Sequence, residues 1–245
     1  MGTSYQSDLL GLVGTIFLWV LFPSYNAAFA PDTTQYRVVV NTVLSLCSSV
    51  MFGFVFSRVF RGGQFKMHDI QRSTLAGGIA MASISSFLIS PGGAIVTGAV
   101  AGSVSTLTLV YVVPALEKKG MHDNFGTLGA WGVPGLIGAI TGIISAGIAT
   151  TQATIFGQSM QALFPDRGTS QAGWNLIALL ITLGIAIIGG VVCGIVSKLF
   201  DSIIFASKQN IPFSDERDWI VPEDFEMTII NNQNSTNNKD NNTKE

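Results

Sequence analysis

Charged side chains are absent from two long stretches of this sequence. Residues 73–116 and residues 124–165 contain no Asp, Glu, Lys or Arg. A transmembrane helix needs about 20 consecutive, predominantly apolar residues, and a charged side chain near the centre of a bilayer is costly and rare. Each stretch is long enough for two bilayer crossings, so the chain is predicted to be a polytopic membrane protein.

The overall composition agrees with this prediction. Only 11% of the 245 residues are charged and 48% are apolar, whereas a soluble domain usually has about 25% charged residues. Acidic residues gather after Pro212, and basic residues lie between the apolar stretches. The expected partner is therefore the lipid bilayer and not nucleic acid. Cys47 and Cys193 lie inside apolar stretches without metal-ligand spacing, so neither a metal nor another cofactor is expected.

Six transmembrane helices are predicted, which makes the expected fold an all-α integral membrane protein. Pro91 to Gly93 divide the first charge-free stretch into a helical hairpin, and residues 164–168 separate the fifth and sixth spans. The stretches are continuously apolar and do not alternate with a period of two, which favours helices over a barrel. The predicted spans are 9–30, 38–57, 73–90, 94–116, 127–150 and 173–197, within a transmembrane domain over residues 1–206 that is followed by a cytoplasmic tail over 207–229 and a disordered, Asn-rich tail over 230–245.

The distribution of Lys and Arg predicts the orientation of these spans. The cytoplasmic side of a membrane protein carries an excess of Lys and Arg. When the chain is threaded through six spans, the basic residues concentrate on one side of the membrane. That side receives Arg58, Arg61, Lys66, Arg72, Lys118, Lys119, Lys198 and Lys208, whereas the other side receives Arg37 and Arg167. Both termini are therefore expected to face the cytoplasm.

Glycines recur four positions apart within the predicted spans. Such spacing lets helix backbones approach closely, and helix association in lipid depends on this packing. The pattern is typical of a compact bundle around a narrow pathway, but ordinary helix packing explains it equally well. The pairs are Gly98 with Gly102, Gly138 with Gly142, and Gly190 with Gly194.

Several segments, read together, resemble the C-terminal half of Rh-type ammonia channels in the wider ammonium transporter superfamily. They occur in the family's order over roughly residues 5–225. The matching segments are YQSDLLGLVGTIFLWVLFPSYNAAFA at 5–30, DIQRSTLAGGIA at 69–80, STLTLVYVVPALEKKG with HDNFG at 105–126, WGVPGLIGAI at 131–140 and FSDERDWIVPE at 213–223.

The resemblance implies a specific architecture. Family members are trimers in which each protomer holds its own pore between two inverted five-helix repeats and conducts ammonia or ammonium. This chain resembles the second repeat, with the last long helix and the tail. The first repeat has no counterpart in the sequence, and with it a recruitment-site Asp, one gating Phe and the first of two pore histidines are missing.

The family's aromatic gate falls on Tyr25. The family pattern Pro-Ser-Phe-Asn corresponds to residues 23–26 here, so Tyr25 is a candidate gate residue and Asn26 a packing or hydrogen-bonding neighbour. A phenol adds a polar group to a constriction that is apolar in the family. Without the resemblance, Tyr25 near the end of its span is typical of the aromatic belt at a membrane interface.

The family's second pore histidine falls on Trp131, which precedes Gly-Val-Pro-Gly. An imidazole accepts and donates a proton near neutral pH, whereas an indole only donates a hydrogen bond. Trp131 therefore cannot replace the histidine chemically. A pore-facing Trp131 is large enough to fill the lumen, and the alternative is that it turns toward a helix interface and packs on glycines.

No His, Asp, Glu, Lys or Arg lies within any predicted span. His68 and His122 lie in loops beside Lys66 and Asp69 or beside Asp123, where a solvated or capping role is expected instead of metal binding. Asp123 matches a family acid before the pore helix and is predicted to cap that helix. Proton-coupled transport usually uses intramembrane ionisable residues, so any conduction is expected to be passive.

The sequence leaves three hypotheses open. The chain is a six-span segment of an Rh-like channel that needs a complementary N-terminal half, an accessory or structural membrane subunit derived from the family, or an incomplete chain whose Met1 is not the biological start. No phosphate-binding loop, metal cluster or catalytic triad is found, so an enzyme is not expected. The chain is expected to form a homotrimer, or a complex with a complementary N-terminal half or other membrane subunits. The expected substrate is ammonia or ammonium, and the expected location is the plasma membrane.

Overall fold

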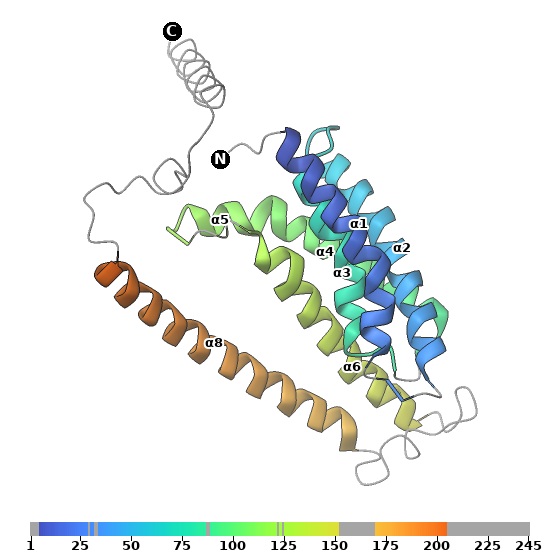
Figure 1. Cartoon of the computed structure of the whole chain (residues 1–245). Coiled ribbons are helices and arrows are strands. Elements are labelled where there is room, and N and C mark those ends of the chain that lie inside the picture. Colours follow the sequence, from blue (N-terminus) through green and yellow to red (C-terminus); the bar gives the residue numbers. More distant parts are fainter. Residues whose placement is uncertain are drawn as a thin grey trace. The chain divides into compact units, whose positions relative to one another are not determined.

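The computed structural model describes residues 5–28, 30–31, 34–86, 89–121, 123, 125–151 and 170–204. Every regular element in these ranges is a helix, so the predicted all-α fold class is confirmed. Contacts divide the chain after Ile187 into two units. The elements are α1 (Tyr5–Ala27), α2 (Gln35–Phe60), α3 (Met67–Ala82), α4 (Pro91–Leu107), η1 (Thr108–Val112), α5 (Val113–Glu117), η2 (Leu128–Gly132), α6 (Val133–Thr151) and α8 (Gln171–Ile204) (Figure 1).

Five helical segments of the described residues are long and apolar enough to cross a membrane: residues 6–27, 35–60, 91–117, 128–148 and 171–200. The 16-residue helix α3 is shorter and lies largely buried among its neighbours. It begins at Met67 and ends at Ala82, whereas the sequence placed the third span at 73–90. The early start follows from Asp69, whose charge is neutralised inside the fold, and residues 83–86 form turns before the next helix.

The start of α4 follows from its sequence. Ser90 is the N-cap, and its hydroxyl oxygen accepts a hydrogen bond from the Gly93 N–H over 3.2 Å. Pro91 is the first helical residue, where its missing N–H costs no helical hydrogen bond. These residues end the turn after α3 and begin the next crossing.

Helices α2, α3 and α4 form the centre of the first unit (Figure 1). The Ser45 hydroxyl in α2 donates to the Gly77 carbonyl in α3 over 2.9 Å. The Ser49 hydroxyl donates to the Ser73 carbonyl over 2.6 Å and accepts from the Gly77 N–H over 3.1 Å, so it stands between two backbone groups of α3. Such bonds join helices in lipid, where apolar contact alone supplies little driving force.

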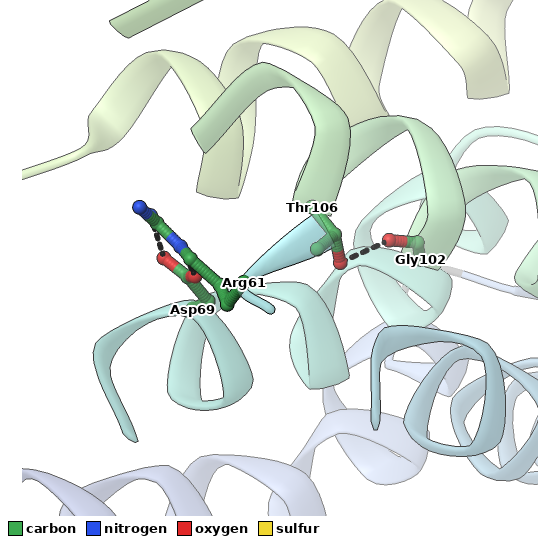
Figure 2. A network of polar contacts seen from close by, with 4 residues as sticks. All are labelled: Arg61, Asp69, Gly102 and Thr106. Atoms are coloured by element: carbon green, nitrogen blue, oxygen red, sulfur yellow. Dashed lines mark hydrogen bonds and ion pairs between the residues drawn. The ribbon is translucent and has the colours of Figure 1, made fainter. Parts of the chain in front are cut away.

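An ion pair lies at one end of this three-helix centre. Arg61 follows α2, and its Nε and Nη2 donate to the two carboxylate oxygens of Asp69 in α3 over 2.8 and 3.1 Å (Figure 2). Asp69 is 1% exposed, so the bidentate geometry satisfies a buried charge. Figure 2 also shows that the Thr106 hydroxyl bonds back to the Gly102 carbonyl of its own helix, over 2.9 Å.

Candidate pore-lining site

The candidate pore residues Tyr25 and Trp131 both contact the ring of Phe22. The Phe22 and Tyr25 ring centroids lie 6.1 Å apart in an edge-on arrangement, and the Phe22 and Trp131 centroids lie 6.5 Å apart. Phe22 is 5% exposed, whereas Tyr25 is 64% and Trp131 50% exposed. Two residues about a hundred positions apart in the sequence therefore share one buried ring, and both leave half or more of their surface uncovered.

Asn26 fixes the end of α1 to the central helices. Its side-chain amide donates to the Thr42 hydroxyl in α2 over 3.2 Å and to the Gly78 carbonyl in α3 over 3.1 Å. Asn26 is buried, and its Oδ1 has no hydrogen-bond partner in the described part of the chain. The structure thus places Asn26 in the packing beside Tyr25.

Trp131 lies in η2, a π-helical turn. The Val133 N–H bonds to the Leu128 carbonyl, five residues earlier, and Pro134 follows directly. A proline ring lacks an N–H and crowds the carbonyl four residues before it, which disturbs the regular α-helix. A single π turn is one way in which a helix accommodates such a disturbance. π turns are rare and are frequently found at functional sites. The sequence signal was the Val133-Pro134 dipeptide after Trp131.

The loop before Trp131 is held from two sides. The Asp123 carboxylate oxygens accept from the N–H groups of Thr127 and Leu128 over 2.8 and 2.9 Å, which is the geometry of a helix cap. Gly126 has φ of +60°, and the Arg72 guanidinium of α3 occupies the space that a Cβ at Gly126 would need. Gly126 therefore accommodates both the turn and the contact with Arg72.

Ionisable groups gather at this same end of the bundle. His68 is in the first turn of α3, before the predicted span begins at Ser73, and Gln71 one turn later donates to the Asp8 carbonyl over 2.6 Å. Burial, and then the charge of Arg72, lower the pKa of His68, which favours the neutral imidazole. Within the described residues, no three His, Cys, Asp or Glu side chains form a group that could hold a metal ion.

Comparison with known proteins agrees with this arrangement. The sequence model of the Ammonium Transporter Family matches residues 1–216. The chain belongs to this ammonium transporter family. The resemblance read from the sequence is therefore confirmed.

Individual relatives of this family member are Rh-type proteins. It is 38% identical over 231 residues to the ammonium transporter Rh type B of Rattus norvegicus, covering 91% of this chain and 50% of the relative. It is 34% identical to the Rhesus-like glycoprotein A of Dictyostelium discoideum, covering 92% of this chain and 44% of the relative. The chain thus spans about half the length of the curated relatives it matches.

A solved structure of the Rh50 channel of Nitrosomonas europaea matches the fold. The match has a TM-score of 0.75 and 25% sequence identity, and it covers 98% of this chain and 57% of that one. The likeness extends along almost the whole chain, so the membrane fold of the family holds for the family member described here.

The predicted packing glycines of this ammonium transporter family member differ in their surroundings. A Cβ at Gly98 or Gly138 would collide with a backbone carbonyl, of Ser45 and Ala80 respectively, and a Cβ at Gly102 would lie 2.6 Å from the Ser49 carbonyl oxygen. These residues hold helices in close contact. In the second unit, a Cβ at Gly190 or Gly194 would meet no atom within 4 Å in the described part of the chain.

A cavity of about 450 Å³ lies beside α6 in the first unit. The Asn175 amide of α8 donates to the Gly142 carbonyl of α6 over 3.5 Å at its edge. The side chains that line this cavity are mostly small and apolar, which suits a lipid chain or another helix better than a polar ligand. The lining residues are Ser83, Gly132, Gly135, Leu136, Ala139, Gly142, Asn175, Ala178, Leu179, Thr182 and Leu183.

Proposed function

We propose that this chain forms one wall of a membrane pore for ammonia or ammonium, and that residues outside this sequence form the facing wall. The observation that carries the proposal is the placement of Tyr25 and Trp131. The resemblance to the family motifs matches them to two family pore positions, and in the structure they meet at the buried Phe22 ring and leave half or more of their own surface uncovered. Such exposure of two large aromatic side chains suits residues that face a lumen.

The chemistry of this wall favours passive conduction. Trp131 stands where the family has a proton-accepting histidine, and an indole only donates a hydrogen bond. Arg61 and Asp69 pair with each other near the start of α3, and the Arg72 guanidinium lies against Gly126. The Trp131 indole takes no proton from a passing ammonium ion, which supports movement of the substrate down its gradient.

A second function is a non-conducting accessory or structural subunit. Trp131 is larger than the histidine it replaces, and the Tyr25 phenol adds a polar group to an apolar gate. Both differences favour a wall that has kept the packing of the family and lost its pore. The glycine and serine contacts between α2, α3 and α4 serve packing in either case.

The proposed assembly is a homotrimer or a complex with a complementary N-terminal half, in the plasma membrane with both termini cytoplasmic. The clustering of charges supports this orientation. Arg61, Arg72 and Asp123 lie at one end of the bundle, together with the Asp8 end of α1. Arg37 lies at the other end, where it donates to the Ser86 carbonyl over 3.3 Å.

Flux measurements test the proposal. The chain is reconstituted in lipid vesicles alone and with the N-terminal half of an Rh relative, and uptake of ammonia and of methylammonium is measured. We expect background uptake by the chain alone and uptake above background with both halves. Background uptake in both preparations, with assembly of the two halves shown by co-purification, rejects the channel and favours the accessory subunit.

The substitution Trp131→His then tests the lumen position. It should raise uptake in the two-half assembly, because it removes bulk and restores a proton acceptor. Trp174→His is the matched control, since Trp174 is 47% exposed on α8 and is not a proposed pore residue. Equal uptake in the two variants contradicts a pore-facing Trp131.

A further inference from the structure

The two π turns in the described part of the chain, η1 and η2, lie against each other. Leu109 of η1 packs on Gly129 of η2, where a Cβ would lie only 2.7 Å from the Leu109 Cδ2. Ser105, one turn before Leu109, donates its hydroxyl to the Gly129 carbonyl over 2.7 Å. Ser105 is fully buried, so this contact joins two membrane helices inside the protein.

The covalent structure explains why the Gly129 carbonyl needs this donor. In an α-helix its partner would be the Val133 N–H, but that group bonds to the Leu128 carbonyl. In continued π register its partner would be residue 134, which is a proline and has no N–H. The carbonyl therefore has no regular backbone donor, and Ser105 supplies one. A buried carbonyl without a partner would cost free energy.

We propose that Ser105 is a positioning residue for Trp131. Its hydrogen bond holds η2 in π register two residues before Trp131, and that register directs the indole onto the Phe22 ring. A change of register by one residue rotates a helix by about 100°, which would move the indole away from Phe22. The inference rests on the proposed function only in treating Trp131 as a pore residue.

A neighbouring serine provides the matched control. The Ser103 hydroxyl in the same helix donates to the Ala99 carbonyl over 2.7 Å, within its own helix. Ser103→Ala and Ser105→Ala therefore make the same chemical change two residues apart. Ser105→Ala alone removes a bond to the turn that carries Trp131.

The fluorescence of Trp131 reports directly on the surroundings of its indole ring. Trp19, Trp174 and Trp219 are replaced by Phe in the full chain, so that Trp131 is the one fluorophore of its kind. Its emission maximum and its quenching by acrylamide are measured in lipid nanodiscs. We expect Ser105→Ala to shift the emission maximum and to change the quenching constant, and Ser103→Ala to leave both at the values of the parent.

Equal spectra for Ser105→Ala and its parent, in a monodisperse protein, overturn the proposal and reduce Ser105 to ordinary packing. If Ser105→Ala does not fold, Ser105→Cys fills the site with a slightly larger side chain and offers a weaker donor. It should shift Trp131 in the same way, and an unchanged spectrum counts against the proposal. Fluorescence does not depend on conduction. A shifted Trp131, together with background uptake by the assembled two halves, therefore supports Ser105 and rejects the proposed channel.

Discussion

The Asn26 side chain in α1 donates a hydrogen bond to the Gly78 backbone carbonyl in α3 over 3.1 Å. The same amide donates to the Thr42 hydroxyl in α2 over 3.2 Å. One buried side chain therefore joins three helices directly beside the candidate gate residue Tyr25. These two bonds tie the end of α1, where Tyr25 lies, to α2 and α3.

Asn26→Ala removes both bonds and leaves the Gly78 carbonyl without this donor. Hydrogen bonds between membrane helices contribute about 0.6 kcal/mol each on average, so we expect a loss of about 1–2 kcal/mol once the cavity is included. Unfolding in mixed micelles by added SDS measures this loss. Ser24→Ala is the control, because the Ser24 hydroxyl donates to the Leu21 carbonyl within its own helix. Equal losses in the two variants would show that the junction adds no stability.

The contact between Gly98 and Ser45 yields a second prediction. A Cβ at Gly98 would collide with the Ser45 backbone carbonyl, which cannot turn away as a side chain can. Gly98→Ala is expected to push α2 and α4 apart and to cost about 1–3 kcal/mol. The melting temperature in detergent checks this. Gly92→Ala in the same helix should be nearly neutral, because its Cβ would meet only the Ser90 hydroxyl at 3.9 Å. A stable Gly98→Ala protein would contradict the close packing.

The sequence predicted the membrane class and fold because charge is a local property. A long apolar stretch without Asp, Glu, Lys or Arg predicts a membrane span, whichever residues it packs against in the fold. The same rule misplaced α3, because Asp69 and Arg72 look like loop residues in the sequence. In the structure Asp69 is buried through its pair with Arg61, and the helix continues past it.

Contacts between distant residues could not be read from the sequence. No local sequence pattern predicts which side chain bonds to which distant carbonyl. The pairs are Ser45 with Gly77, Ser105 with Gly129, and Asn26 with Gly78. The π turns were not predicted, because the Val-Pro dipeptides at residues 113–114 and 133–134 fall inside predicted spans and give no sign of a change in helix type. Their effect depends on which neighbouring side chain satisfies the displaced carbonyl.

Asp123 gives a third prediction. Its carboxylate accepts from the N–H groups of Thr127 and Leu128 at the start of the segment that carries Trp131. Asp123→Ala should cost about 1 kcal/mol, the usual effect of losing an N-cap, and should speed hydrogen exchange of the Thr127 and Leu128 amides. Glu117→Ala removes an exposed carboxylate at the end of α5 and is the control. Unchanged exchange in Asp123→Ala would show that water replaces the cap.

The ion pair between Arg61 and Asp69 gives the last prediction. Arg61→Gln leaves the Asp69 carboxylate buried without its charge partner. We expect the free energy of unfolding to fall by up to about 3 kcal/mol. This is the low end of the range for buried pairs, because the Arg61 side chain is 25% exposed. Asp69→Asn should cost less, since a neutral amide is cheaper to bury. The double variant should recover part of the loss of Arg61→Gln, because no lone charge remains inside.

A double-mutant cycle from SDS unfolding measures this coupling. Arg58→Gln is the control for loss of a nearby positive charge, because the Arg58 guanidinium lies over the Phe65 ring, 5.6 Å from its centroid. It should be close to neutral. If the two substitutions of the ion pair add without coupling, the pair does not stabilise this end of the bundle, and other contacts of α3 fix its position.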